Sequence, residues 1–405
     1  MISLNLLSSL SNLTFGTTSS PVDRKPGKTK AKILVPPELM KQIGDAASRK
    51  TEFLYDGLTS EQRAKVAVIN AFAHSSIEFL NEYRVVGVVG FGGNGCVVAA
   101  EDKRVFQGPV AIKIIYKPRP GRNQEFPGEI TNLRELNTVC ESRGVLRCLA
   151  AWQDWNHFYL VTELFGSDWT AGIPGTNHPN LKFQTLSCGK MRAHSLQFSS
   201  GASDLWSWQL AHRRYMRKTQ GSQLLPTDPI KHILRQIALA LLAIHNAGFF
   251  HGDVKLENIL LEYPTSTFGG VNKSDFPGVM IADYGHCRRV EEGVLRYGTE
   301  EVAPVEFLEG SPFLQDKLDG RRSDVFALGI VLFVLLSERG RFPKVARWRQ
   351  ADVFLDVEGE FPCQFDDCVS VGARSLLNGM CMVDPSRRLD LVGVLEHPWL
   401  IGSDL

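Results

Sequence analysis

The sequence predicts an α+β protein with two lobes, a small strand-rich N-terminal lobe followed by a larger helical lobe. Of its 405 residues, 43% are hydrophobic and 22% are charged, which is the usage of ordinary globular proteins. Between about residues 83 and 163, runs of β-branched and apolar residues alternate with glycines, a pattern that favours strands. From about residue 205 onward, apolar residues recur at helical spacing and predict a mainly helical second part.

The composition argues against several classes of protein. The chain carries 45 Lys and Arg against 44 Asp and Glu, a net charge of +1, so its charge gives no case for nucleic-acid binding. No apolar run approaches the ~20 residues of a membrane span, and the N-terminus lacks the basic segment of a secretory signal. The 8 cysteines are scattered without a CxxC pair, which is typical of reduced thiols. We therefore expect a cytoplasmic or nuclear protein, whose oligomeric state the sequence does not indicate.

The chain is organised around one domain, predicted at residues 81–400. Residues 1–59, rich in Ser, Thr and Asn and then in basic residues, predict a largely disordered tail. Residues 60–80 carry apolar side chains at helical spacing behind a capping serine, and predict a helical extension. Residues 168–203 are dense in Gly, Ser, Thr, Pro and Asn, and predict a surface insertion at the hinge between the lobes.

A glycine-rich turn, GFGGNG, joins two of the predicted strands. Gly90, Gly92 and Gly95 form a GxGxxG pattern, in which the absence of Cβ atoms lets the backbone approach phosphate groups. A dinucleotide-binding site would need a helix directly after the turn. The strand CVVAA follows instead, so the dinucleotide interpretation is excluded.

A lysine follows in an apolar strand, where its charge is costly unless it meets an anion. Lys113 lies in the sequence PVAIKII, and the predicted helix after it offers Glu129 and Glu135 as partners. Helical phase favours Glu129, because it shares one stripe with Leu133 and Leu136, whereas Glu135 lies off that stripe. We therefore expect Glu129 to pair with Lys113, and Glu135 remains the alternative.

The sequence HGDVKLEN places three chemically complementary side chains in one loop. Asp253 can orient an incoming hydroxyl and take its proton, Lys255 can neutralise a transferring phosphoryl group, and Asn258 can hold a metal ion. Asp283 comes directly after an apolar strand and before Tyr and Gly, a place that suits a metal ligand. These four residues favour phosphoryl transfer.

In these motifs the chain resembles a eukaryotic-type protein kinase from about Asn81 to Trp399. The family's glycine loop and VAIK lysine are present, the HRD catalytic loop has the form HGD, and DFG has the form DYG. Thr299 and Glu306 stand at the family spacing of its GT and APE segments. The HPWL and DLWSW segments resemble calmodulin-kinase-like and PAS-kinase-like domains. The resemblance implies the bilobal protein-kinase-like fold.

The resemblance also extends to the buried core of the second lobe. Asp324 opens an apolar run that resembles the family's buried, Asp-bearing helix. Arg388 resembles the arginine that pairs with the Glu of the APE segment, which here is Glu306. Tyr284, in place of the DFG phenylalanine, is expected to pack against His251.

The resemblance implies that the cofactors are ATP and Mg²⁺. Gly90, Gly92 and Gly95 would cover the ATP phosphates, and Lys113, held by Glu129, would contact the α- and β-phosphates. Around the adenine the resemblance implies Val97, Ala111 and Leu260 on the two faces of the base, Thr162 behind it, and the backbone of Glu163 and Phe165 along its edge.

It further implies transfer of the γ-phosphate to Ser or Thr hydroxyls of protein substrates. Asp253 would be the catalytic base and Lys255 would contact the γ-phosphate, while Asn258 and Asp283 would bind Mg²⁺. Glu257 occupies the place that receives an upstream arginine in kinases with basic substrates.

Two departures from the family agree with each other. The HGD sequence lacks the arginine that normally grips an activation-loop phosphate, and residues 286–298 contain no Ser or Thr, with Tyr297 as their one hydroxyl. We therefore expect a kinase that needs no phosphorylation of this loop, with Glu291 and Glu292 supplying fixed charge. The histidines of the helical part, such as His245, are expected at the surface or in loops rather than as ligands.

Two alternatives remain. A pseudokinase scaffold would fit the HGD sequence and the APE segment, in which Ala303 and Pro304 are displaced by one place. A small-molecule phosphotransferase would fit HGD followed by Asn, as in aminoglycoside- and choline-kinase-like enzymes. Those enzymes lack the segments that carry Glu306, Asp324 and Arg388, so the sequence favours an active protein kinase.

Overall fold

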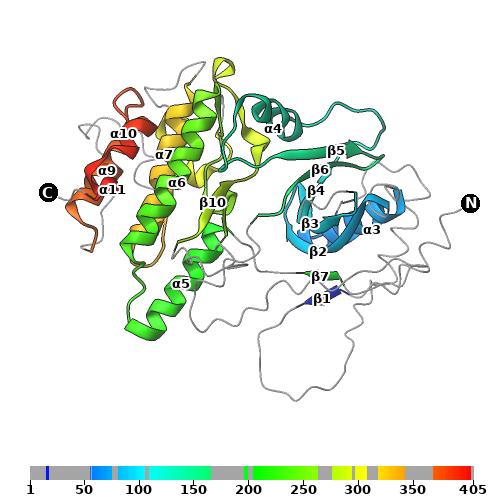
Figure 1. The fold of residues 1–405 in the computed structure, drawn as a ribbon, viewed down its shortest axis with the longest axis horizontal. Helices are drawn as coiled ribbons and strands as arrows, with labels where there is room; N and C mark the ends of the chain where they lie inside the picture. The colour runs from blue at the N-terminus through cyan, green and yellow to red at the C-terminus, as the bar shows by residue number, and fades with distance from the viewer. Residues whose placement is uncertain are drawn as a thin grey trace, which may run out of the picture. The chain divides into compact units, whose positions relative to one another are not determined.

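The structure, a computed structural model, divides into two compact units, one rich in strands and one mainly helical (Figure 1). The α+β class predicted from the sequence is therefore confirmed. The first unit comprises Met1–Phe126, Cys148–Leu164 and Pro179–Ala202, and the second the remaining segments. The described residues are 15–17, 55, 57–74, 81–104, 109–165, 196–198, 204–262, 276–293, 297–307, 318–342 and 368–402. Most of the predicted tail and of the predicted insertion lies outside them.

The first unit is built on a seven-stranded sheet with the order β1-β7-β2-β3-β4-β6-β5. Its strands are β1 (Phe15–Thr17), β2 (Tyr83–Phe91), β3 (Gly95–Asp102), β4 (Pro109–Tyr116), β5 (Cys148–Gln153), β6 (His157–Glu163) and β7 (Leu196–Phe198). The five strands from β2 to β6 pair antiparallel, whereas β7 pairs parallel with β1 and β2. The sequence did not predict β1 or β7, which belong to the expected tail and insertion.

One face of this sheet is covered by helix α3 (Ser60–His74). Small side chains of the helix, such as Ala64 and Ala67, are fully buried in one apolar cluster with Val98 of β3 and Ile112 of β4. Alternate residues of a strand point to opposite faces, so the side chains between these buried positions lie on the other face. Ala111 and Lys113 are of that kind, and both are only half-buried.

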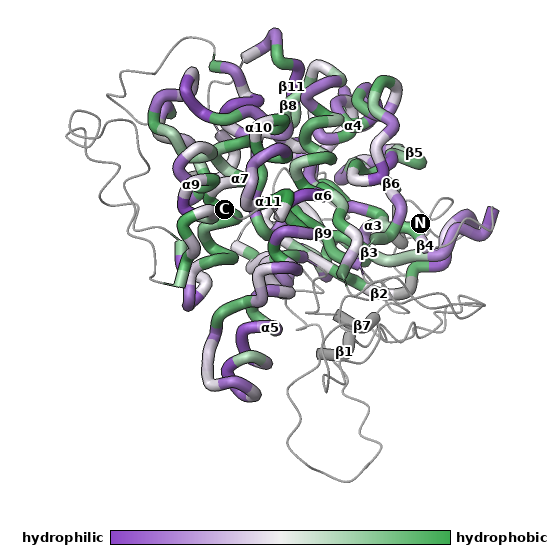
Figure 2. Tube along the Cα trace, turned by 60° about the vertical axis from the view of Figure 1, so that its left-hand side comes forward, coloured by the Kyte–Doolittle hydropathy of each residue, from purple (hydrophilic) through white to green (hydrophobic). Residues whose placement is uncertain are grey.

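The second unit contains helix α7 (Gly320–Leu336), whose residues Ser323–Leu335 are all buried. Figure 2 colours the described residues of the chain by hydropathy. A helix that is apolar on every side belongs in a protein core. Among the described residues, its other α-helices are α4 (Gly128–Val139), α5 (Leu205–Gln220), α6 (Thr227–Asn246), α9 (Val371–Met380), α10 (Leu391–Leu395) and α11 (Pro398–Ile401). Its described strands are β8 (Phe249–Phe250), β9 (Ile259–Glu262), β10 (Gly278–Ile281) and β11 (Arg288–Arg289). Among the described residues, no helix is long and apolar enough to cross a membrane.

The ion pair predicted between Glu306 and Arg388 is present in the core of this unit. Two guanidinium nitrogens of Arg388 each lie 2.9 Å from a carboxylate oxygen of Glu306. Arg388 also donates hydrogen bonds to the carbonyl groups of Met382 and Arg322. The pair therefore connects the Glu306 segment with the segment that precedes α10, as the sequence predicted.

Candidate active site

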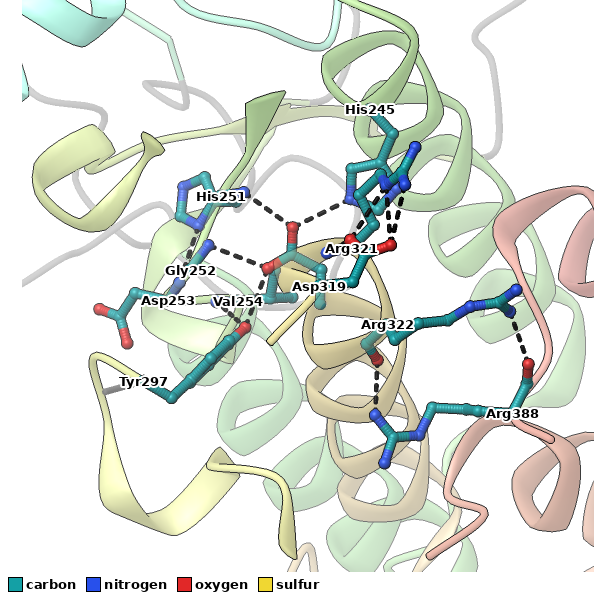
Figure 3. A network of polar contacts seen from close by, with 11 residues as sticks. His245, His251, Gly252, Asp253, Val254, Tyr297, Asp319, Arg321, Arg322 and Arg388 are labelled. Carbon is teal, nitrogen blue, oxygen red and sulfur yellow. Dashed lines mark hydrogen bonds and ion pairs between the residues drawn. The ribbon is translucent and has the colours of Figure 1, made fainter. Parts of the chain in front are cut away.

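The HGD loop, with His251, Gly252 and Asp253, lies between β8 and β9 (Figure 3). Asp324 of α7 fixes its backbone. The N–H groups of His251 and Gly252 donate hydrogen bonds of 2.7 and 2.9 Å to the Asp324 carboxylate, which is completely buried. His245, expected at the surface, is instead half-buried, with Nε2 3.0 Å from the same carboxylate. The backbone of the loop is therefore hydrogen-bonded to the buried helix that the sequence predicted.

The three side chains of the HGDVKLEN sequence meet at one carboxylate oxygen. Lys255 Nζ lies 2.8 Å from Oδ2 of Asp253, and Asn258 Nδ2 donates to the same oxygen at 3.1 Å and to the Asp253 carbonyl at 2.8 Å. The other oxygen, Oδ1, is buried and has no hydrogen-bond partner among the described residues. An unsatisfied buried acceptor is costly, so this oxygen is well suited to accept a hydrogen bond from a substrate hydroxyl.

The GT segment closes around the same carboxylate. Lys255 Nζ also donates to Thr299 Oγ1 at 2.8 Å, and the N–H of Gly298 donates to the carbonyl of Gly252 at 3.0 Å. A Cβ atom on Gly298 would lie 2.7 Å from both Cγ and Oδ1 of Asp253, closer than real Cβ contacts occur. Only glycine therefore lets this segment approach Asp253 so closely.

Asp283 begins the DYG turn with a strained backbone. Its φ of 64° and ψ of 80° are left-handed, a conformation that non-glycine residues seldom adopt and that concentrates at functional sites. The following ring was predicted to pack on His251, and it does: the rings of Tyr284 and His251 meet edge to face, 5.3 Å apart.

Asn258 and Asp283 lie on neighbouring segments, because the N–H of Ala282 donates to the Asn258 carbonyl at 2.8 Å. The amide nitrogen of Asn258 is used toward Asp253, which leaves its amide oxygen as a possible ligand. Mg²⁺ prefers oxygen ligands and is commonly held by one or two protein oxygens together with substrate phosphates. The residues present therefore fit a Mg²⁺ ion that binds with a nucleotide.

The lysine of the first unit shares one sheet face with three of the predicted adenine contacts. Val97 pairs with Lys113, and Ala111 pairs with Thr162. Directly paired residues point to the same side of a sheet, and Ala111 and Lys113 are two apart on β4. This face, opposite α3, presents an ammonium group beside small and apolar side chains.

The glycine-rich turn joins β2 to β3 in the same unit. The N–H of Gly92 donates to the carbonyl of Gly95 at 2.8 Å and closes the turn. A Cβ atom on Gly90 or on Gly92 would meet no atom within 4 Å. Packing within the described chain does not require glycine at these two positions, so the approach of a ligand explains them better.

The remaining adenine contacts predicted from the sequence belong to both units. Glu163 ends β6 in the first unit, whereas Leu260 of β9 belongs to the second, where it pairs with Met280 of β10. Phe165 also belongs to the second unit, and its ring lies near Gly278. Each unit thus brings its own share of the predicted site residues together.

Helix α4 carries both carboxylates that the sequence offers as partners of Lys113. Glu135 pairs with Arg289 of β11, whose Nε lies 3.0 Å from Oε1. The helix buries Ile130 and Leu133 toward the core, and Glu129 stands in its first turn, half-buried. Glu135 is therefore committed to Arg289, and the assignment of Glu129 to Lys113 stays a prediction.

The sequence motifs missed one acidic residue beside the HGD loop. Asp204 caps α5, where its carboxylate accepts a hydrogen bond of 2.7 Å from the N–H of Ser207. Burial raises the pKa of Asp204. Partial burial also raises the pKa of Glu257, and the charges of Asp204 and Asp253 add to that rise. An Asp directly before a helix is typical of an N-terminal helix cap, so the sequence could have predicted that role for Asp204. Nothing in the sequence indicated that Asp204 lies near Glu257.

Parts of this chain are similar to known proteins. The protein kinase domain family matches residues 209–400. The serine/threonine-protein kinase PLK4 of Nematostella vectensis is 25% identical over 330 residues, which cover 80% of this chain and 27% of that protein. Calcium/calmodulin-dependent protein kinase type 1 of Caenorhabditis briggsae is 27% identical over 177 residues, or 42% of this chain and 45% of that protein. Human calcium/calmodulin-dependent protein kinase type IV is 30% identical over 200 residues, 47% and 37% of the two chains. The chain thus spans less than half the length of each of these relatives.

Proposed function

We propose, since this chain belongs to the eukaryotic-type serine/threonine protein kinases, that it transfers the γ-phosphate of ATP to Ser or Thr hydroxyls of protein substrates. The observation that carries the proposal is the Asp253 carboxylate. One of its oxygens is held by Lys255 and Asn258, while the other is buried and receives no hydrogen bond from any residue that the structure describes. A general base needs such a fixed carboxylate with one open acceptor.

The proposed mechanism assigns each side chain one task. Oδ1 of Asp253 accepts the hydroxyl proton of the substrate and so orients the attacking oxygen. Lys255 stabilises negative charge that develops on the transferring group, and Thr299 holds its ammonium in place. Asn258 and Asp283 would hold Mg²⁺, which when bound with ATP neutralises phosphate charge.

The nucleotide side of the proposal rests on the first unit. The glycine turn at Gly90 and Gly92 would cover the phosphates, because it leaves open space above the backbone. Lys113 would contact the phosphates from the sheet face that it shares with Val97 and Ala111. An apolar face beside a cation suits a purine base with an attached phosphate chain.

We also propose that the kinase works without activation-loop phosphorylation. The first half of that segment is held by contacts that need no phosphate. Arg289 pairs with Glu135 of α4, and Asn132 of the same helix donates to the carbonyl of Cys287. Arg288 lies 3.9 Å from Glu292, one of the two residues expected to supply fixed charge.

The preferred substrates are proposed to carry a basic residue near the acceptor hydroxyl. Asp204 and Glu257 are two acidic side chains beside the catalytic loop, and burial raises the pKa of each. An arginine of a substrate would offset the negative charge that Asp204 and Asp253 place beside Glu257, and its guanidinium offers donors to the Glu257 carboxylate. Glu257 stays accessible to solvent, as a docking residue must.

A cytoplasmic or nuclear location is part of the proposal. The described cysteines Cys96, Cys140, Cys148, Cys287, Cys368 and Cys381 are free thiols, as is usual in a reducing compartment.

The proposal is tested by phosphate transfer from Mg·ATP to a panel of Ser and Thr peptides, with Ala-substituted peptides as controls. Transfer to the hydroxyl peptides alone supports it. Nucleotide binding without transfer to any peptide would favour a pseudokinase scaffold. Transfer to an aminoglycoside or to choline, but to no peptide, would favour a small-molecule phosphotransferase.

A further inference from the structure

Tyr297, directly before the GT segment, is almost completely buried and its hydroxyl makes two hydrogen bonds (Figure 3). It accepts a hydrogen bond of 3.1 Å from the N–H of Val254, and it lies 3.1 Å from Oδ1 of Asp324, to which it donates. Val254 directly follows the proposed base. One phenol therefore connects the end of the activation segment, the catalytic loop and the buried helix α7.

These bonds complete a set that fixes the backbone on both sides of Asp253. On its N-terminal side, the N–H groups of His251 and Gly252 are held by Asp324. On its C-terminal side, the N–H of Val254 is held by Tyr297. Without the hydroxyl, this last N–H would be a buried donor that lacks its partner, which is a costly arrangement.

Gly252, the residue before Asp253, cannot itself link the loop to the activation segment. Gly252 has a φ of +75°, and a Cβ atom there would lie 2.6 Å from the carbonyl oxygen of His286. This position therefore offers no side chain that could link the loop to the activation segment. Tyr297 makes that link through a neutral hydroxyl, with no phosphate.

We propose that the Tyr297 hydroxyl is a positioning group that holds Asp253 in its working geometry and couples the activation segment permanently to the catalytic loop. The inference rests on the proposed kinase function and names how its site is kept assembled. Burial, followed by the charge of Asp324, raises the pKa of Tyr297 well above its usual value, so the hydroxyl stays protonated and keeps donating. A buried hydroxyl with both roles occupied is also a poor acceptor for phosphate.

The test compares the wild type with Tyr297→Phe, which keeps the ring near Phe307 and removes only the hydroxyl. We expect exchange of the Val254 amide proton to become roughly three- to tenfold faster, as the loss of one hydrogen bond predicts. We expect kcat to fall roughly ten- to a hundredfold, with little change in KM for ATP or peptide, because a displaced base affects the transition state alone. Tyr215→Phe in α5 is the matched control, since no hydrogen bond of that hydroxyl occurs among the described residues.

The exchange measurement separates this inference from the kinase proposal. We call the hydrogen bond from the Val254 N–H to the Tyr297 hydroxyl the tether. If the wild type transfers no phosphate but the Val254 amide still loses protection from exchange in Tyr297→Phe, the kinase proposal fails and the tether is supported. If Tyr297→Phe folds and keeps both its exchange rate and its kcat, the tether is wrong. Should the variant not fold, the wild type decides: a Val254 amide that exchanges as slowly as those of His251 and Gly252 supports the tether, and fast exchange overturns it.

Discussion

Arg388 binds both carboxylate oxygens of Glu306 at 2.9 Å, and neither residue is more than 2% exposed. Such a pair is stable only while both partners are present, because either charge alone would be buried without compensation. We predict that Glu306→Ala lowers the free energy of unfolding by about 3–5 kcal/mol. Urea denaturation followed by circular dichroism measures this loss.

The exposed pair of Arg321 and Asp319 provides the control. Arg321→Ala should cost less than about 1 kcal/mol, because solvent screens exposed ion pairs. The double variant Glu306→Leu/Arg388→Met should recover most of the stability that Glu306→Ala loses, since it removes both buried charges. If Glu306→Ala costs no more than Arg321→Ala, the buried pair does not have the structural role given to it here.

A second prediction concerns the close approach of Gly298 to Asp253. In Gly298→Ala the new methyl group would lie 2.7 Å from Cγ and Oδ1 of Asp253, so the carboxylate has to move. We expect kcat to fall roughly a hundredfold while the protein stays folded. Gly393→Ala in α10 is the control, because the nearest atom to its methyl group is the end of the Leu389 side chain at 3.1 Å. Equal kcat values for the two variants would contradict the prediction.

A third prediction concerns the hydroxyl that holds Lys255. Thr299→Ala removes the acceptor 2.8 Å from Nζ, and we expect kcat to fall roughly ten- to a hundredfold, the value of one hydrogen bond to a charged group. Thr299→Ser keeps the hydroxyl and should retain most of the activity. Steady-state kinetics on one Ser peptide compare both variants with the wild type, and equal loss in both would show that the methyl group matters rather than the hydroxyl.

A fourth prediction tests the acidic pair as a docking site for arginine. Glu257→Gln should raise KM for an Arg-containing peptide roughly ten- to a hundredfold and leave KM for its Arg→Ala counterpart unchanged. Asp228→Asn, an acidic residue in the first turn of α6, is the control. Equal changes for the two peptides would mean that Glu257 does not contact the arginine.

The same pair predicts a pH dependence. Burial raises the pKa of Asp204 and of Glu257, so both carboxylates take up protons at a higher pH than ordinary surface carboxylates. As the pH falls through these raised values, the pair loses the charge that attracts arginine. The preference for the Arg peptide should therefore shrink toward acid pH, and shrink less in Glu257→Gln. A preference that stays constant across that range would contradict the assignment.

The effect of these two carboxyl groups on folding stability has the opposite pH dependence from their effect on arginine binding. A carboxyl group whose pKa is raised by folding stabilises the folded state below its unfolded pKa, and this contribution is lost as the pH rises through the folded pKa. Without a bound cation, Asp204 and Glu257 therefore weaken the fold at neutral pH. Their role is better explained by binding than by stability.

The catalytic loop could be predicted from the sequence because its partners are local. Asp253, Lys255 and Asn258 lie within one short loop, so their residue types and spacing already bring them together. The contact between Glu306 and Arg388 spans distant parts of the chain, and only the resemblance to a family predicted it. The spacing of residues along the sequence does not by itself predict an ion pair between partners so far apart in the chain.

Asp204 and Tyr297 acquire their roles from long-range contacts that no pattern announces. Asp204 looks like an ordinary helix cap, and its influence on Glu257 depends on how α5 packs near the loop. Tyr297 stood out only as the one hydroxyl of its segment, and its two partners, Val254 and Asp324, are brought to it by folding. The strands β1 and β7 were missed because three residues are too few to show a periodicity.

The measurement that tests the central claim most directly is γ-phosphate transfer from Mg·ATP to Ser and Thr peptides by the wild type and by Asp253→Asn. The substitution keeps the shape of the side chain and removes its capacity as a base. We predict transfer by the wild type and a loss of roughly a hundredfold or more in kcat for the variant, with nucleotide binding unchanged. Wild-type transfer that persists at the same rate in Asp253→Asn, or no peptide transfer by a wild type that binds Mg·ATP, would contradict the account.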